Sequence, residues 1–399
     1  MMRTSTREHG SHGKLDDCSS RMIAHPIVVG HGPLRYREEL AVPGFVTPGN
    51  LFFYTMLIRN SRSWFVAALL SSTLILGCKK EEQPAQTGQA PSPQAPVIPS
   101  RPVPAFDADR AFKDIVTQVD FGPRVPNTPP HAKELEYLRK ALSECTPDVQ
   151  LQTFTESGYK PGETLNLTNV IASFNPSATE RVLVLTHWDS RPWADEDPNK
   201  ANNDKPVPAA NDGGSGTAVM LELARQFKNN PPPIGVDLLF DDGEDYGKYD
   251  VDELNRYFLG VKYFVKTKPA NYNPRFAILL DMVGDKSAVF QPEYNSVQSA
   301  PSYTTEVWRA AASLGLSDFK SAQGQDISDD HLPLIQAGIP SVDIIDGELV
   351  GHESTDPERK YWHTIDDLPK HLSPATLEQV GKLLLTLIYD RLPHDIPTL

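Results

Sequence analysis

The chain has 399 residues, of which 39% are hydrophobic and 23% charged, a composition typical of ordinary globular proteins. This length is enough for one large folded domain with additional tails. The formal net charge of -14 argues against nucleic acid as a partner, because binding phosphate requires a basic face. The three cysteines lie in segments of different character and indicate no disulfide framework: Cys18, Cys78 and Cys145.

The N-terminal part of the chain shows no sign of a folded domain. Residues 1–55 have no sustained hydrophobic period, so we interpret them as a non-structured upstream extension. Residues 56–78 contain an apolar run that is too short to span a membrane and ends at Cys78. This segment resembles a bacterial lipoprotein signal, which implies a translation start at Met56, cleavage after Gly77 and lipidation of Cys78. The resemblance implies a location in the bacterial cell envelope, on its periplasmic or extracellular face, with the lipid anchor as the only membrane contact.

The mature chain is predicted to begin with a tether and to continue as one catalytic domain. Residues 79–105 are rich in Pro, Gln, Ala and Ser and cannot form a core, whereas residues 106–399 have the pattern of a folded domain. Asp107 is a typical helix cap, and four apolar positions with helical spacing follow it: Phe112, Ile115, Val116 and Val119. A second helix is predicted through Leu135, Leu138 and Leu142.

Short apolar runs predict six strands, at residues 149–154, 169–174, 181–186, 236–240, 276–280 and 341–345. Helices are predicted to alternate with the later strands, one beginning at Gly213 and one at Ser373. The glycine-rich start of the helix at Gly213 lacks the Lys-Ser/Thr ending of a phosphate-binding loop. The pattern predicts an α/β domain of three layers, with helices on both faces of a mostly parallel sheet that is mixed at one edge.

Possible metal ligands follow the predicted strands and helix starts, where function in open α/β sheets collects. They come from five segments of the chain: His187 with Asp189, Asp212, Glu244 with Asp245, Asp281, and His363. Zinc binds His nitrogen and carboxylate oxygen, and a catalytic zinc site keeps one position open for water or substrate. Asp189 stands two residues after His187 on extended chain, so its carboxylate can orient the imidazole. These residues together predict a zinc enzyme.

Seven short motifs between residues 106 and 389 resemble the zinc-dependent glutaminyl-peptide cyclotransferases of animal type and their bacterial relatives. They are Phe121-Gly-Pro-Arg124, His187-Trp-Asp-Ser190, Asn211-Asp212, Asp242-Gly-Glu-Asp245, Leu280-Asp-Met-Val-Gly284, Ser328-Asp-Asp-His331 and Trp362-His-Thr-Ile-Asp-Asp367. That family shares its fold with the di-zinc aminopeptidases. The resemblance therefore implies a zinc aminopeptidase-like fold and conversion of the N-terminal glutamine of peptides or proteins to pyroglutamate.

The resemblance also assigns roles to individual residues. It implies one catalytic zinc held by Asp212, Asp245 and His363, with Glu244 as the general acid/base. Asp281 and Asp329 resemble the carboxylates of the hydrogen-bond network around Glu244, where like-charge repulsion could raise its pKa. Trp362 resembles the aromatic wall of the substrate pocket. Ser328 stands in the pocket where animal members have Gln.

Two other functions remain open on the sequence. In a di-zinc aminopeptidase, His187 and Asp281 would bind a second zinc that Asp212 bridges to the first. A lipoprotein that had kept the fold and lost the chemistry would act as a binding module. The polar segment at residues 193–205 is interpreted as a solvated loop rather than a calcium site, Cys145 as a buried or half-buried free thiol, and the protein as a monomer.

Overall fold

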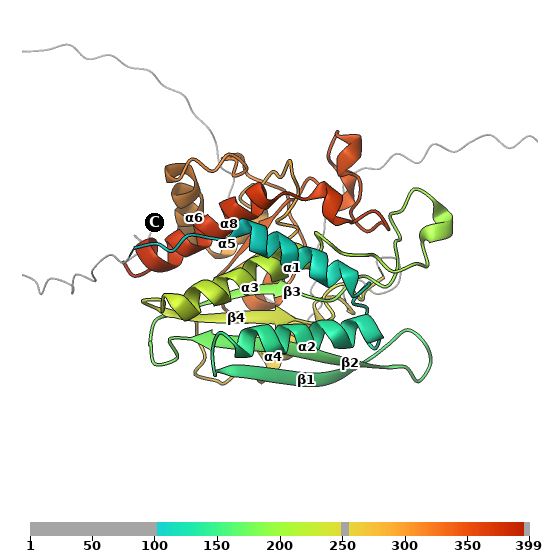
Figure 1. Ribbon diagram of the computed structural model, residues 1–399, viewed down its shortest axis with the longest axis horizontal. Coiled ribbons are helices and arrows are strands. Elements are labelled where there is room, and N and C mark those ends of the chain that lie inside the picture. The colour runs from blue at the N-terminus through green and yellow to red at the C-terminus, as the bar shows by residue number, and fades with distance from the viewer. Residues whose placement is uncertain (1–101, 249–254, 395–399) are drawn as a thin grey trace, which may run out of the picture. The chain divides into compact units, whose positions relative to one another are not determined.

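The computed structural model describes residues 102–248 and 255–394 (Figure 1). The predicted N-terminal extension, the signal segment with Cys78 and almost all of the tether lie outside the described residues. Among the described helices, none combines the length and apolar character needed to cross a membrane.

One sheet of six strands forms the centre of the described domain. Its strands are β1 (Val149–Ser157), β2 (Thr164–Phe174), β3 (Arg181–His187), β4 (Gly235–Asp241), β5 (Ala277–Asp281) and β6 (Ser341–Ile345), in the spatial order β1-β2-β4-β3-β5-β6. The strands β4, β3, β5 and β6 are parallel, whereas β2 is antiparallel to β4 and β1 is antiparallel to β2. The predicted fold class, a mostly parallel sheet that is mixed at one edge, is confirmed.

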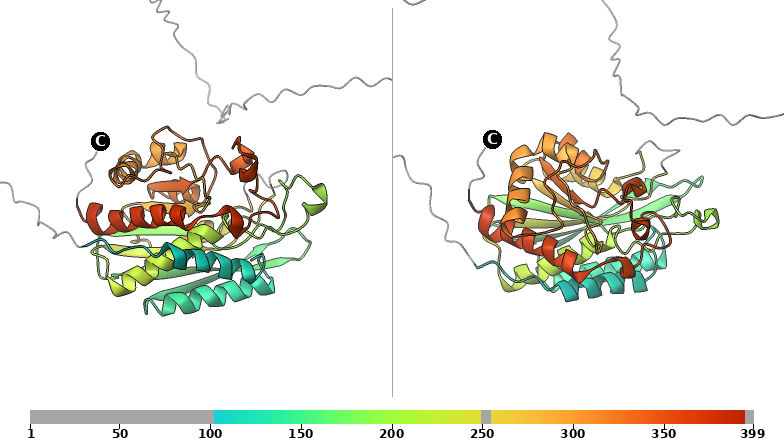
Figure 2. Two further views of the ribbon diagram at one scale, coloured as in Figure 1. Left: turned by 45° about the horizontal axis from the view of Figure 1, so that its top comes forward. Right: turned by 90° about the horizontal axis from the view of Figure 1, so that it is seen from above.

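Helices cover both faces of this sheet. They are α1 (Ala108–Asp120), α2 (Pro129–Ser143), α3 (Gly214–Asn229), α4 (Leu259–Thr267), α5 (Tyr294–Ser299), α6 (Pro301–Ser313), α7 (His331–Gln336) and α8 (Pro374–Thr386). Short 3-10 turns lie at Lys200–Asn202, Val350–His352, Pro357–Arg359 and Pro369–His371, and a π-helical turn at Leu387–Arg391 follows α8. In Figure 1, α1 and α3 lie alongside one another over β3 and β4, and Figure 2 shows α8, in red, crossing the same face.

The alternation of side chains along β3 divides the core between the two faces. Val182 and Val184 pack with α1, α3 and α8, whereas Leu183 and Leu185 pack with α4 and α7 on the other face. All four side chains are fully buried. A strand buried on both faces reads as a continuous apolar run, which is why these strands could be located from the sequence.

The first helix begins at the predicted cap, and its inward face differs in part from the prediction. The Asp107 carboxylate accepts a hydrogen bond from the Arg110 amide at 3.0 Å. Of the four apolar positions with helical spacing, Ile115 is fully buried, whereas Val116 is 37% exposed. A polar residue, Gln118, lies on the inward face, where it donates to the carbonyl of Gly214 at 3.0 Å.

Glu134 on α2 is buried without a polar contact of its own. Neither of its carboxyl oxygens has a hydrogen-bond partner within the described part of the chain, and the residue has no exposed surface. Burial raises the pKa of Glu134 to about 8, against the opposing attraction of the Arg124 guanidinium. The folded protein therefore keeps this carboxyl protonated at pH values where the unfolded chain has lost the proton.

Replacing Glu134 with Gln is expected to change how stability depends on pH. Between about pH 4.5 and pH 8 the folded protein binds one more proton at Glu134 than the unfolded chain, so its free energy of unfolding falls as pH rises. This contribution, on the order of 5 kcal/mol across the window, is absent in Glu134→Gln. Urea unfolding of both proteins at several pH values should give curves that diverge over that range, and parallel curves would contradict the assignment.

Candidate metal centre

The sheet brings the acidic and histidine residues together, because its parallel strands end at one edge. His187 is the last residue of β3, Asp281 the last of β5, and Glu244 and Asp245 follow the end of β4. Asp212 precedes α3, and His363 lies between two 3-10 turns in the left-handed backbone region, with φ 52°. The structure therefore brings together residues that lie up to 176 positions apart in the sequence, from His187 to His363.

Two groups of three residues have geometry suited to one metal ion each. In the first, Asp212, Asp245 and His363 have ligand atoms within 4.8 Å of one another. In the second, the same holds for His187, Asp212 and Asp281. Asp212 belongs to both groups, and its two oxygens face different histidines: Oδ2 lies 3.6 Å from His363 Nε2, and Oδ1 lies 3.1 Å from His187 Nε2.

The buried atoms of these groups fit a metal ion. Within the described chain, no hydrogen-bond partner is found for Asp212 Oδ2, Asp245 Oδ2, Asp281 Oδ1 or His187 Nε2. Asp212, Asp245 and His363 are each less than 9% exposed. Buried carboxylates need compensation, and a donor set of His nitrogen and carboxylate oxygen without Cys suits zinc. The residues present can therefore hold zinc.

Gly213 allows the backbone before α3 to approach His187 closely. This residue has φ 79°, and a Cβ added to it would lie 2.8 Å from His187 Cε1. Any side chain here would displace the imidazole that faces Asp212. The glycine-rich start of α3 thus serves close packing at the metal centre.

Two buried side chains fix the backbone of the segment that carries Asp212. The Arg124 guanidinium donates to the carbonyls of Pro208 and Ala209, at 2.6 and 2.7 Å. The Asp367 carboxylate accepts from the amides of Asn211 and Asp212, at 2.9 and 3.1 Å. The carboxylate of Asp212 is therefore free to face both histidines while its backbone is held.

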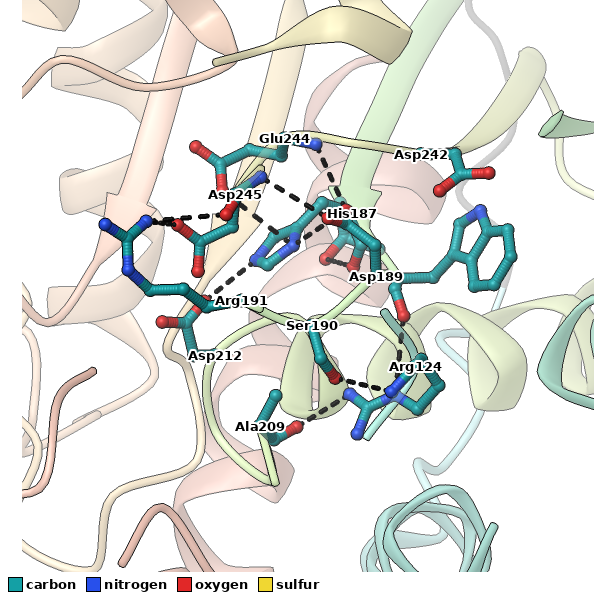
Figure 3. Close-up of polar contacts among 12 residues, drawn as sticks. Arg124, His187, Asp189, Ser190, Arg191, Ala209, Asp212, Asp242, Glu244 and Asp245 are labelled. Atoms are coloured by element: carbon teal, nitrogen blue, oxygen red, sulfur yellow. Dashed lines mark hydrogen bonds and ion pairs between the residues drawn. The ribbon is translucent and has the colours of Figure 1, made fainter. Parts of the chain in front are cut away.

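Asp189 connects His187 to the segment after β4. Its Oδ1 lies 3.5 Å from His187 Nδ1, and the same carboxylate accepts from the amides of Glu244 and Asp245 (Figure 3). Burial alone would lower the pKa of His187, but Asp189, Asp212 and Asp281 outweigh it and hold that pKa well above the usual value. Each nitrogen atom of the His187 imidazole therefore faces a carboxylate: Nδ1 faces Asp189, and Nε2 faces Asp212 and Asp281.

Glu244 has its carboxyl group beside other acidic side chains. Its pKa is raised well above the usual value, first by burial and then by repulsion from Asp245, with a further contribution from Asp329. Asp281, which the sequence analysis places in the same network, faces His187 Nε2 at 3.4 Å. Glu244 can therefore hold a proton at a pH where an exposed glutamate would be ionised.

A cavity of about 320 Å³ opens over the first group of three residues. The acidic residues that line it include Asp212, Glu244, Asp245, Asp281 and Asp329, beside His363. Its walls include Ser328, Tyr257 and a set of apolar side chains: Phe258, Met282, Ile327, Ile345, Val350 and Trp362. The Trp362 ring stacks on His363 with ring centroids 3.7 Å apart. His187 is 1% exposed and is not one of the lining residues.

The sequence analysis missed Arg191 and Asp195, which lie against the metal centre. Arg191 donates from Nη1 to Asp245 Oδ1, and Figure 3 shows its guanidinium directed at that carboxylate. Asp195 belongs to the segment at residues 193–205, which was predicted to be a solvated loop. That prediction was wrong in part, since Ala194, Asp197 and Asn202 are buried. The charged composition of the segment resembled a solvated loop, and only the fold brings it to the site.

Cys145 is the one cysteine within the described residues, and it is free and half-buried, as predicted. Burial raises its pKa, so the thiol is not activated.

Comparison with protein-family models matches residues 169–388 to peptidase family M28. Among curated proteins, an aminopeptidase of Bacillus subtilis is 30% identical over 65% of this chain, but the chain covers only 51% of that protein. The glutaminyl-peptide cyclotransferase of Bos taurus is 22% identical over 67% of this chain and 78% of its own length.

Some solved structures have higher sequence identity to this chain than these curated proteins do, and the match covers nearly the whole of each solved chain. The glutaminyl cyclase of Tannerella forsythia is 42% identical, with a TM-score of 0.68, over 72% of this chain and 99% of its own. A zinc-dependent exopeptidase from Parabacteroides distasonis is 39% identical, with a TM-score of 0.67, over 73% of this chain and 100% of its own. Relatives of this chain thus include proteins described as cyclases and as peptidases.

Proposed function

Because this chain belongs to peptidase family M28, we propose that it is a zinc-dependent glutaminyl-peptide cyclotransferase that acts on N-terminal glutamine. The observation that carries the proposal is the cavity over Asp212, Asp245 and His363. This cavity is lined by Glu244 and by Trp362, whose ring stacks on the candidate ligand His363. The likeness to the Tannerella forsythia glutaminyl cyclase over almost its whole length supports the same reaction.

The reaction needs two groups of the substrate to be held together. The α-amine nitrogen of the glutamine forms a bond with the carbon of its own side-chain carboxamide, and the bond from that carbon to the amide nitrogen breaks to release ammonia. Apolar walls that include Trp362 and Ile327 can hold the side chain folded back toward the amine. Holding the substrate in this conformer accounts for a large part of the catalysis expected of such an enzyme.

The reaction also requires the transfer of one proton, from the attacking α-amine to the carboxamide nitrogen, which then leaves as ammonia. We assign this transfer to Glu244, whose carboxylate would take the proton from the α-amine and return it to the leaving ammonia. Its raised pKa suits a group that both accepts and donates a proton. Zinc, held by Asp212, Asp245 and His363, would polarise the carboxamide carbonyl.

A di-zinc aminopeptidase is the second candidate, and one observation favours it. The two oxygens of Asp212 face His363 and His187 separately, as a carboxylate that bridges two ions would. Every residue of a second group, with His187 and Asp281, is present and buried. Two such ions would activate water for hydrolysis of the first peptide bond.

Mass spectrometry of two peptides separates these functions. The protein from about residue 102 onward, loaded with zinc, is incubated with a peptide that begins with Gln and with the same peptide beginning with Leu. We expect loss of one ammonia from the Gln peptide and no change in the Leu peptide. Removal of the whole Leu residue would contradict the cyclase assignment and support the aminopeptidase.

A further inference from the structure

Arg191 is a buried cation at the metal centre that the proposed reaction does not use. Its side chain is 1% exposed and lies beyond the end of β3, four residues after His187. Burying a guanidinium is costly unless it is paired, so its partners indicate what it does.

The guanidinium contacts two carboxylates from different segments. Towards Asp195 it makes a two-point contact, from Nε to Oδ1 at 2.7 Å and from Nη2 to Oδ2 at 2.6 Å. Its remaining nitrogen, Nη1, donates to Asp245 Oδ1 and lies 3.4 Å from the Asp245 carbonyl. Nη2 also donates to the Tyr257 hydroxyl at 3.3 Å. A planar guanidinium with these contacts has one fixed orientation.

This arrangement determines which oxygen of Asp245 is available to a metal. Oδ1 is occupied by Arg191, whereas Oδ2 has no hydrogen-bond partner among the residues described and lies 3.6 Å from His363 Nε2. Asp245 can therefore offer a single oxygen to the group of ligands with His363 and Asp212. The positive charge of Arg191 also reduces the repulsion between Asp245 and the neighbouring carboxylates.

The other partner of Arg191 lies against the second ligand of the same group. Asp195 Oδ1 is 3.7 Å from His363 Nδ1, on the opposite side of the imidazole from the nitrogen that faces Asp212 and Asp245. The next residue, Glu196, donates its amide to the His363 carbonyl at 3.3 Å. A carboxylate facing the second nitrogen of a ligating histidine orients the ring.

We propose that Arg191, which is buried, and Asp195, which is partly exposed, act as one ion pair that positions Asp245 and His363, two of the three ligands in the candidate zinc group. Arg191 directs one oxygen of Asp245 towards the metal, and Asp195 orients the His363 imidazole. The two are positioning residues, because neither is assigned contact with the metal or the substrate. The inference depends on the zinc ligands of the proposed function and not on whether the reaction is cyclisation or hydrolysis.

The test is the zinc affinity of purified variants, measured by competition with a chromophoric chelator. Arg191→Met keeps the apolar stem and removes the charge, and we expect it to weaken zinc binding about 10- to 100-fold. Arg191→Lys should recover part of the affinity, because an ammonium can contact one carboxylate but not both in the same geometry. Asp195→Asn should lose about tenfold, with Asp245 still contacted by Arg191.

A second arginine, partly buried and paired with a buried carboxylate, provides the control. Arg181 at the start of β3 makes a two-point contact with Asp237, at 2.8 and 2.7 Å, away from the metal centre. Arg181→Met should lower stability and leave zinc affinity unchanged. An equal loss of affinity in Arg181→Met, or wild-type affinity in both Arg191→Met and Asp195→Asn, would overturn the inference.

Two further outcomes keep the inference separate from the proposed function. If Arg191→Met does not fold, Asp195→Asn still tests the pair, since the Asp195 side chain is 34% exposed and its loss disturbs the core less. A wild-type protein that binds no zinc would contradict the ligand set itself and with it the proposed function. Zinc binding with no cyclisation would contradict only the proposed reaction.

Discussion

Glu244→Gln is expected to lower kcat/KM for cyclisation of an N-terminal Gln peptide by about 10²- to 10⁴-fold while zinc remains bound. The amide cannot take the proton from the attacking amine, so the transfer assigned to Glu244 is lost. Glu244 belongs to neither group of metal ligands, which is why zinc content should not change. Ammonia release measures the activity, and elemental analysis of the dialysed protein measures the zinc.

Glu222→Gln is the control for this substitution. Glu222 is a fully buried glutamate that lies in the middle of α3 and pairs with Arg110 at 2.6 Å, away from the cavity that Glu244 lines. Its replacement should reduce stability and leave kcat/KM and zinc content near those of the wild type. A Glu244→Gln variant that keeps wild-type turnover would remove Glu244 from the acid/base role.

Asp212→Asn is expected to weaken zinc binding by more than about 100-fold. This loss is larger than the roughly 10- to 100-fold that typically follows when a residue that only orients a ligand is removed. Asp212 is the one residue shared by both groups of candidate ligands, so its carboxylate matters for one ion or for two. An Asn side chain supplies a neutral oxygen and has no second anionic oxygen to offer. Chelator competition and zinc content after dialysis measure this effect.

The zinc content of Asp281→Asn distinguishes a protein that binds one zinc ion from a protein that binds two. Asp281 belongs only to the group with His187, so a one-zinc enzyme should keep its metal in this variant. A protein that binds two ions should lose one of them. Retention of zinc by Asp212→Asn at wild-type affinity would contradict the assignment of Asp212 as a ligand.

The four parallel strands β3, β4, β5 and β6 could be predicted because each is a short apolar run buried on both faces, whereas the edge strand β1 is largely exposed. An apolar run predicts a strand but not its contacts. Leu183 and Val184 are both apolar, and the sequence does not show which helix each side chain will contact. The order β1-β2-β4-β3-β5-β6 depends on pairings between distant segments, such as His187 with Asp241, that no local pattern records. The exposure of Val116 has a related cause, since helical spacing alone does not locate the centre of the buried face.

The candidate site was predicted in part because its residues follow strands and match short motifs. His187, Asp212 and Asp281 are of this kind. Arg191 and Asp195 were not predicted, because their significance depends on a contact with Asp245, 54 residues further along the chain. Their only local signal is a spacing of four residues, which is equally typical of an exposed ion pair.

The arrangement of parallel strands also bears on how catalytic sites of this kind can evolve. Each candidate ligand sits at or just beyond the end of a different element, so a mutation can exchange one ligand without altering the register of β3, β4 or β5. Changes at His187 or Asp281 would thus alter the second group of candidate ligands and leave the first group, with Asp212, Asp245 and His363, unchanged. One fold can carry different reactions in this way, with the sheet unchanged and the differences confined to the residues at its edge.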